Sequence, residues 1–185
     1  MKLPLVAVDV HLNARLQPIH RGEIFEDPLH TFLRRRNRKS GVTGGGTALS
    51  PKNEVLSCDI EARLVGGARD ELVALADFLE KAGAPKGSYV AVHGGERIDF
   101  GLLEGTAMYV DGTNTPPDEA DDLNIALPSI IELLPYGTRM LSWWHGPEDV
   151  AMYFYGESHE RTLSSLQFAI QNTSFAKDSR FEQIA

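Results

Sequence analysis

The spacing of apolar residues switches in this chain between the two-residue period of strands and the 3.6-residue period of helices. In the first half, strands are predicted at residues 5–12, 47–49, 54–65 and 89–92, and helices at 27–36 and 70–82. The helix at 27–36 is expected to be capped by Asp27. The resulting order, strand–helix–strand–strand–helix–strand, is that of the ferredoxin-like (split β-α-β) fold.

The second half repeats the same order of elements with little residue identity. Strands are predicted at residues 106–110, 140–144, 150–155 and 180–184, and helices at 118–134 and 159–171. Pro128 is expected to break or start the first of these helices. We therefore predict an α+β protein of tandem ferredoxin-like units at 1–93 and 106–185, joined at 94–105 by a junction that can form a hairpin. The units are expected to share one mainly antiparallel sheet with helices on one face, in a single compact domain.

Composition excludes several classes of protein. The chain is 42% hydrophobic and 24% charged, which is typical of a globular protein. Its net charge of −8 argues against general nucleic-acid binding, which needs a broad positive surface. We find neither a signal peptide nor a stretch of about 20 apolar residues, so no membrane association is expected and a cytoplasmic location is predicted. Cys58 is the single cysteine; it excludes an internal disulfide and is expected to be buried.

Alternation places a group of charged residues on the outward face of the first predicted unit. Its first strand carries Asp9 and His11, and its third carries Asp59, Glu61 and Arg63. These strands are neighbours in the split β-α-β fold, so the side chains are expected to lie within about 5–8 Å of one another. The group suits a solvated face, a partner-binding surface, acid–base chemistry or a divalent ion.

The same argument places aromatic and acidic residues outward in the second unit. The candidate binding residues there are Tyr109, Asp111, Tyr153, Tyr155 and Glu157. Tyrosine is enriched in protein interfaces, although packing under a loop would also explain these side chains. Trp143 and Trp144 are adjacent on a strand, so only one can lie in the core. We take Trp144 as a candidate pocket residue.

Two further segments have a structural and a functional interpretation. The glycine-rich stretch at 43–47 lacks the Gly-Lys-Ser/Thr ending of a phosphate-binding loop, and a flexible loop leading into an edge strand is favoured. The segment 34–39 holds five of the 18 Lys and Arg residues. Basic residues at a helix C-terminus interact favourably with the helix dipole, and a phosphate-binding patch is the alternative.

These observations favour a non-catalytic acidic binding protein without a cofactor. An inhibitor or immunity-type protein that neutralises a basic toxin or nuclease is the specific expectation, because opposite charge speeds association. The first alternative is a sensor or carrier that stacks a small ligand on its tyrosines and tryptophan. The second is a small metal-assisted hydrolase that uses Asp9, His11, Asp59 and Glu61.

Overall fold

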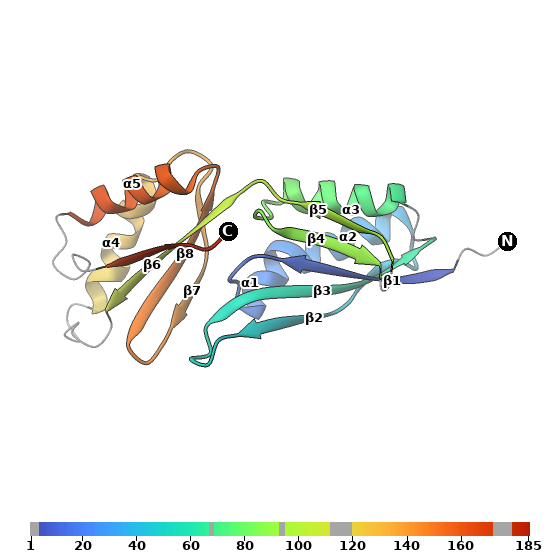
Figure 1. The fold of residues 1–185 in the computed structure, drawn as a ribbon, viewed down its shortest axis with the longest axis horizontal. Helices are drawn as coiled ribbons and strands as arrows, with labels where there is room; N and C mark the ends of the chain where they lie inside the picture. The colour runs from blue at the N-terminus through green and yellow to red at the C-terminus, as the bar shows by residue number, and fades with distance from the viewer. Residues whose placement is uncertain (1–3, 67–68, 93–94, 112–119, 172–178) are drawn as a thin grey trace. The chain divides into compact units, whose positions relative to one another are not determined.

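A computed structural model of the chain describes residues 4–66, 69–92, 95–111, 120–171 and 179–185, without the side chains of 120–125. The chain forms two compact units (Figure 1). The first contains Met1–Ser50 and Val55–Leu102, and the second contains Pro51–Glu54 and Leu103–Ala185. Residues 51–54 are therefore part of the second unit, although they connect two strands of the first.

The first unit contains a five-stranded antiparallel sheet in the order β2-β3-β1-β4-β5. Its strands are β1 (Leu5–Leu12), β2 (Gly41–Leu49), β3 (Val55–Val65), β4 (Ser88–Val92) and β5 (Arg97–Phe100). The strands predicted at 5–12, 54–65 and 89–92 are confirmed to within a residue at each end. The strand predicted at 47–49 is three times longer than expected, and β5 is the additional strand that the junction allowed.

Helices cover one face of this sheet. They are α1 (Pro18–Arg21), the π-helical turn η1 (Gly22–Glu26), α2 (Asp27–Arg36) and α3 (Arg69–Lys81). Val8, Val10 and Ile60 point from the strands into the core, where Leu33 and Leu75 are also buried. The predicted cap at Asp27 is wrong, because η1 runs directly into α2, Asp27 is already helical and no side chain caps that end.

Glycine at position 45 lets a polar pair pack beneath β2. Arg21 is 7% exposed, and its guanidinium bonds Glu26 at 2.6 Å and the Gly46 carbonyl oxygen at 2.6 Å. A Cβ at Gly45 would lie 2.7 Å from the Glu26 carboxylate and 2.8 Å from the Asp59 carbonyl oxygen. The glycine-rich stretch is thus part of the strand itself, and the loop expected there is absent from the described chain.

The second unit contains a four-stranded antiparallel sheet in the order β7-β8-β6-β9. Its elements are β6 (Glu104–Asp111), α4 (Ala120–Glu132), β7 (Arg139–His145), β8 (Asp149–Gly156), α5 (His159–Ile170) and β9 (Arg180–Gln183). Met108, Met152 and Phe154 form its core with Ile130 of α4 and Leu166 of α5. Ser158 caps α5 by accepting a hydrogen bond from the Arg161 amide.

Three sequence predictions about packing are wrong. Pro128 lies inside a continuous α4, because the helix packs Ala126, Leu127 and Ile130 on the core while proline removes only one backbone donor. Strict alternation along the strand predicted at 54–65 would turn Leu56 inward, but Leu56 is 44% exposed. Val55 is buried instead, beside a register irregularity between β2 and β3. The strands form two antiparallel sheets, one in each unit, where a single shared sheet was expected. The protein is therefore a mixed α+β protein with two antiparallel sheets.

Cys58 is buried beneath the first sheet, as predicted. Its Sγ lies 3.6 Å from the Ala14 carbonyl oxygen, and burial raises the pKa of the thiol to about 12. Because the thiolate is the reactive form, we expect native protein to resist iodoacetamide at pH 8 and to be alkylated once it is unfolded in urea. Mass spectrometry would measure the modification, and rapid alkylation of the native protein would contradict the buried placement.

Within the described residues, no helix is both long enough and apolar enough to cross a membrane.

Candidate functional site

The helix-free face of the first sheet carries two rows of outward side chains that run across the strands. In one row, His11 of β1 lies opposite Asp59 of β3 and Tyr89 of β4. In the other, Asp9 lies opposite Glu61. Like charges directly opposite each other destabilise a sheet, so the Asp9–Glu61 pair has no evident role in holding the fold together.

His11 is held between a carboxylate and an aromatic ring. Its Nδ1 lies 2.8 Å from an Asp59 oxygen, and its ring stacks on Tyr89 at a centroid distance of 4.9 Å. The Arg97 guanidinium lies 3.7 Å from the centre of the Tyr89 ring and pairs with Asp99. This arrangement fixes the His11 imidazole. It does not extend to a metal site, since no three His, Cys, Asp or Glu side chains in the described parts of the chain are grouped to hold an ion.

Two carboxylates on β3 have an oxygen near the edge strand, and the other oxygen of Asp59 bonds His11 of β1. A Glu61 carboxylate oxygen lies 3.1 Å from the position that a Cβ would take on Gly44, and an Asp59 oxygen lies 3.9 Å from the same position on Gly46. Both glycines belong to β2, the outermost strand. Because glycine has no side chain, the carboxylates of β3 can extend over β2 to the edge of the sheet. We call Gly44, Gly46, Asp59 and Glu61 the acidic edge.

The exposed edge of β2 lacks the usual protection against pairing with another strand. Proteins commonly place charges or proline on an edge strand, or keep it very short. The opposite edge follows this rule, because β5 has four residues and carries Arg97 and Asp99. In contrast, β2 has nine residues, none of them charged or proline. Arg21, on the helix side, donates to the Gly46 carbonyl oxygen and to the Thr47 hydroxyl of β2, and a carbonyl oxygen can accept a second bond.

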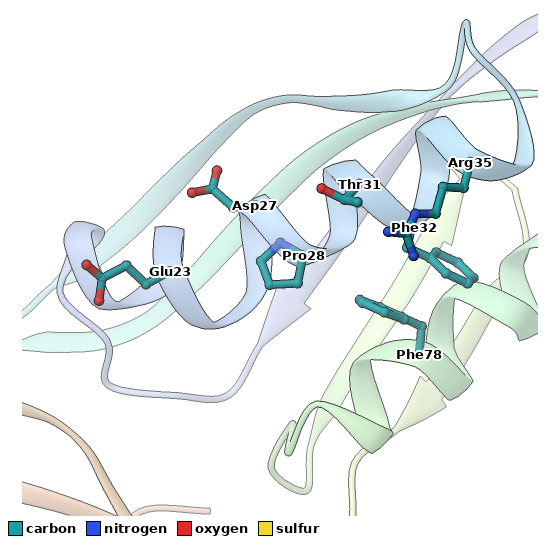
Figure 2. A pocket seen from close by; sticks show the side chains of 7 residues that line it. All are labelled: Glu23, Asp27, Pro28, Thr31, Phe32, Arg35 and Phe78. Atoms are coloured by element: carbon teal, nitrogen blue, oxygen red, sulfur yellow. The ribbon is translucent and has the colours of Figure 1, made fainter.

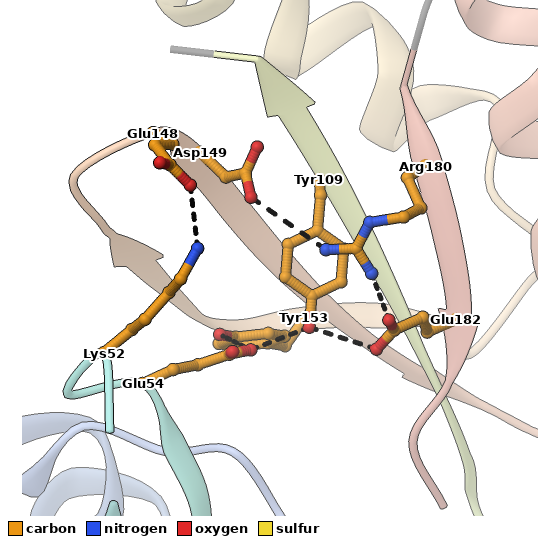
Figure 3. A network of polar contacts seen from close by, with 8 residues as sticks. All are labelled: Lys52, Glu54, Tyr109, Glu148, Asp149, Tyr153, Arg180 and Glu182. Carbon is orange, nitrogen blue, oxygen red and sulfur yellow. Dashed lines mark hydrogen bonds and ion pairs between the residues drawn. The ribbon is translucent and has the colours of Figure 1, made fainter. Parts of the chain in front are cut away.

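The predicted tyrosine face of the second unit is covered, so the expectation that it is open is wrong. Tyr109, Tyr153 and Tyr155 are 4%, 1% and 0% exposed. The Tyr109 and Tyr153 hydroxyls both donate to the same oxygen of Glu54, at 2.7 and 2.8 Å (Figure 3). Glu54 belongs to the 51–54 segment of the same unit, and this segment packs over the tyrosines as a loop would.

Charged residues surround this buried tyrosine pair. The Arg180 guanidinium lies 3.8 Å from the centre of the Tyr109 ring and pairs with Glu182, which also accepts from the Tyr109 hydroxyl at 3.3 Å (Figure 3). Lys52 pairs with Glu148 at 2.8 Å, which raises the pKa of the lysine. The network holds the 51–54 segment to the sheet.

Trp144 is also covered. It is 8% exposed, its indole donates to the Asn53 carbonyl oxygen at 3.2 Å, and its ring packs on Gly146, where a Cβ would lie only 1.9 Å away. Trp143 on the opposite face is 45% exposed, in agreement with the expectation that only one of the pair enters the core. Trp144 therefore does not line an accessible pocket.

The remaining candidate residues are exposed. Arg63 is exposed at the far end of β3, opposite Ala7. Asp111 and Glu157 are exposed in the second unit, at the end of β6 and directly after β8. The sequence analysis considered Gly44 and Gly46 only as part of the glycine-rich stretch at 43–47, and it did not single out Tyr89. The sequence signal for the acidic edge is a run of glycines followed by a strand with acids at alternate positions. This pattern indicates a site only when the register between β2 and β3 is known.

No protein-family model matches the chain, and no curated protein matches it. Solved structures give weak similarities. A protein of unknown function from Galdieria sulphuraria is 12% identical over 98% of both chains, with a TM-score of 0.30. A candidate monooxygenase from Fusobacterium nucleatum is 10% identical over 99% of this chain and 92% of its own, with a TM-score of 0.32. The regulatory subunit of aspartate kinase from Thermus thermophilus is 14% identical over 91% of this chain and 97% of its own, with a TM-score of 0.27. Similarity at this level carries no argument about fold or function.

Proposed function

We propose that this chain is a non-catalytic binding protein that takes a basic segment of a partner protein as an additional strand along the edge of β2. The observation that carries the proposal is the acidic edge: the carboxylates of Asp59 and Glu61 lie over Gly44 and Gly46 of an uncharged edge strand. Strand addition uses backbone hydrogen bonds for affinity and alternate side chains for specificity.

The spacing of the acidic edge defines the partner. A strand added to β2 would lie about 4.8 Å from it, with residues at alternate positions about 6.6 Å apart on one face. Asp59 and Glu61 are also two residues apart. Lysine or arginine at positions i and i+2 of the partner strand would therefore reach across the two glycines to one carboxylate each.

Charge complementarity suits the same partner. The protein has a net charge of −8, and on the face itself Asp9 lies opposite Glu61. A cation bound at Glu61 would relieve that repulsion as well as pair with a carboxylate. An inhibitor or immunity-type protein that neutralises a basic toxin or nuclease fits this binding mode, and we infer that class for the chain.

We also infer that each unit has a ferredoxin-like fold. In the first unit the strands before β5 have the order β2-β3-β1-β4, and in the second the order is β7-β8-β6-β9. Both place the first strand of the unit between its third and its last, with helices after the first and third strands. This arrangement supports a tandem repeat of the split β-α-β pattern.

A designed peptide tests the proposed binding mode. We expect a peptide of about eight residues with lysine at alternate positions and valine between them to bind the wild-type protein, as measured by calorimetry. Combining Asp59→Asn with Glu61→Gln should weaken binding about tenfold or more, because two charge-assisted contacts are lost. The substitutions keep the side-chain sizes, so the sheet should remain folded.

Two controls distinguish strand addition from general attraction between opposite charges. Asp99→Asn combined with Asp77→Asn removes the same number of charges from exposed positions on β5 and α3 of the same unit, and binding should change less than twofold. A peptide of the same composition with its lysines contiguous should bind more weakly. Equal loss in both double variants, or equal binding of both peptides, would overturn the proposal.

A further inference from the structure

Two hollows adjoin on the outer side of α2, away from the acidic edge. One, of about 490 Å³, is lined by Glu23, Asp27, Pro28, Thr31, Phe32, Arg35 and Phe78 (Figure 2). The other, of about 600 Å³, is lined by His30, Thr31, Arg34, Arg35 and Arg38. Because Thr31 and Arg35 line both, a single small molecule can occupy the two hollows together.

The second hollow is basic and has no acidic residue in its lining. Arg34 and Arg38 are joined through a bond from the Arg34 guanidinium to the Arg38 carbonyl oxygen, which holds the chain after α2 against the helix. Among the described residues, none of the three arginines of this hollow has a carboxylate partner. Arg36 on the same helix differs, because it pairs with Glu71 through two bonds of 3.0 Å, which raise the pKa of its guanidinium.

Unpaired guanidinium groups gathered on two turns of chain repel one another, and a bound anion removes that repulsion. Arginine presents several N–H donors in a planar fork, which suits the oxygens of a phosphate group. The Thr31 hydroxyl and the His30 ring supply further donors in the lining of the hollow. The dipole at the C-terminal end of α2 opposes an anion, but it is small beside the charge of three arginines.

The first hollow is mainly apolar. Phe32 and Phe78 stack at a centroid distance of 4.4 Å, and Pro28 continues the apolar wall (Figure 2). Glu23 and Asp27 lie at the end of the hollow away from Arg35 (Figure 2). A flat apolar body can lie against this wall while an attached anionic group reaches Arg35 and the basic hollow.

We propose that these hollows form one binding site for a small molecule that carries a phosphate group on a flat apolar body, such as a nucleoside monophosphate. The phosphate lies among Arg34, Arg35 and Arg38, and the apolar body lies against Pro28, Phe32 and Phe78. A small ligand fits better than a nucleic acid, since the protein as a whole has a charge of −8 and repels an extended polyanion. This site is separate from the acidic edge, and its test does not depend on the proposed function.

Calorimetry with three probes tests the site in the full-length protein. We expect adenosine monophosphate to bind about tenfold more tightly than inorganic phosphate, and adenosine to bind most weakly, because each half of the ligand has its own hollow. Arg35→Gln should weaken binding of adenosine monophosphate about tenfold or more. Phe78→Leu should weaken the binding of adenosine monophosphate and leave the affinity for inorganic phosphate within twofold of wild type.

Arg63→Gln is the matched control, because it removes an equal charge from an exposed position on β3, outside both hollows. It should leave the affinity for adenosine monophosphate within twofold of wild type. The proposal is overturned if Arg63→Gln weakens binding as much as Arg35→Gln, if the nucleotide binds no more tightly than phosphate, or if neither binds at millimolar concentration in low salt.

Discussion

Replacing Glu54 with alanine is expected to lower the free energy of unfolding of the second unit by about 3 kcal/mol, because two buried tyrosine hydroxyls share this carboxylate. The Tyr153 side chain is 1% exposed and its hydroxyl lies 2.8 Å from Glu54, so water cannot easily replace the acceptor. Both tryptophans are in β7 of the same unit, so urea unfolding followed by tryptophan fluorescence measures the effect directly.

Two variants separate the hydrogen bonds from the charge. Glu54→Gln keeps an oxygen that can accept from both hydroxyls, and we expect it to be less destabilising than Glu54→Ala. Glu148→Ala removes the same charge from an exposed position that pairs with Lys52, and it should leave the unfolding midpoint almost unchanged. If Glu148→Ala destabilises as much as Glu54→Ala, the buried tyrosine contacts are not what stabilises the 51–54 segment.

Gly101→Ala is expected to destabilise the first unit by about 3 kcal/mol or more. Gly101 has a φ of +101°, and a Cβ there would lie 2.0 Å from the Pro85 carbonyl oxygen. The backbone cannot easily shift to make room, since the Gly101 amide donates to Glu80 at 3.0 Å and the Leu102 amide to the Ala84 carbonyl at 3.3 Å. Amide hydrogen exchange in the core strands should accelerate accordingly, with Val10 and Val90 as the reporters.

Gly137→Ala distinguishes the collision from the backbone strain. Gly137 also has a positive φ, +83°, but a Cβ there would have no neighbour within 4 Å. Strain alone should lower the free energy of unfolding by about 1–2 kcal/mol, measured by tryptophan fluorescence in the second unit. Comparable losses at both positions would show that the contact with Pro85 does not matter.

Apolar periodicity predicted the strands and helices that bury a regular apolar face of their own. The alternation of Val8, Val10 and Leu12 marked β1, and the helical spacing of Leu72, Leu75 and Leu79 marked α3. It did not predict elements that are packed by side chains from distant parts of the sequence. Glycine has low strand propensity, yet residues 43–47 form a strand because Arg21 and Glu26 fill the space beneath Gly45.

The two candidate faces differ for a similar reason. Alternation placed Asp9, His11, Asp59 and Glu61 on one face, and the strand register brings these four together. It also placed Tyr109 and Tyr153 on the helix-free side of their sheet, but it could not show that Glu54, 55 and 99 residues away in the sequence, covers them. Long-range polar contacts of this kind leave no periodic signal.

Hydrogen exchange of the backbone amides of β2 is the most direct test of the binding mode. With the alternating lysine–valine peptide bound, we predict slower exchange at those amides of residues 44–46 that point away from β3, because these groups would pair with the added strand. Amides around Arg35 on α2 should exchange at an unchanged rate. Peptide binding without added protection in β2, or with protection confined to another surface, would contradict the claim that the acidic edge takes a basic strand.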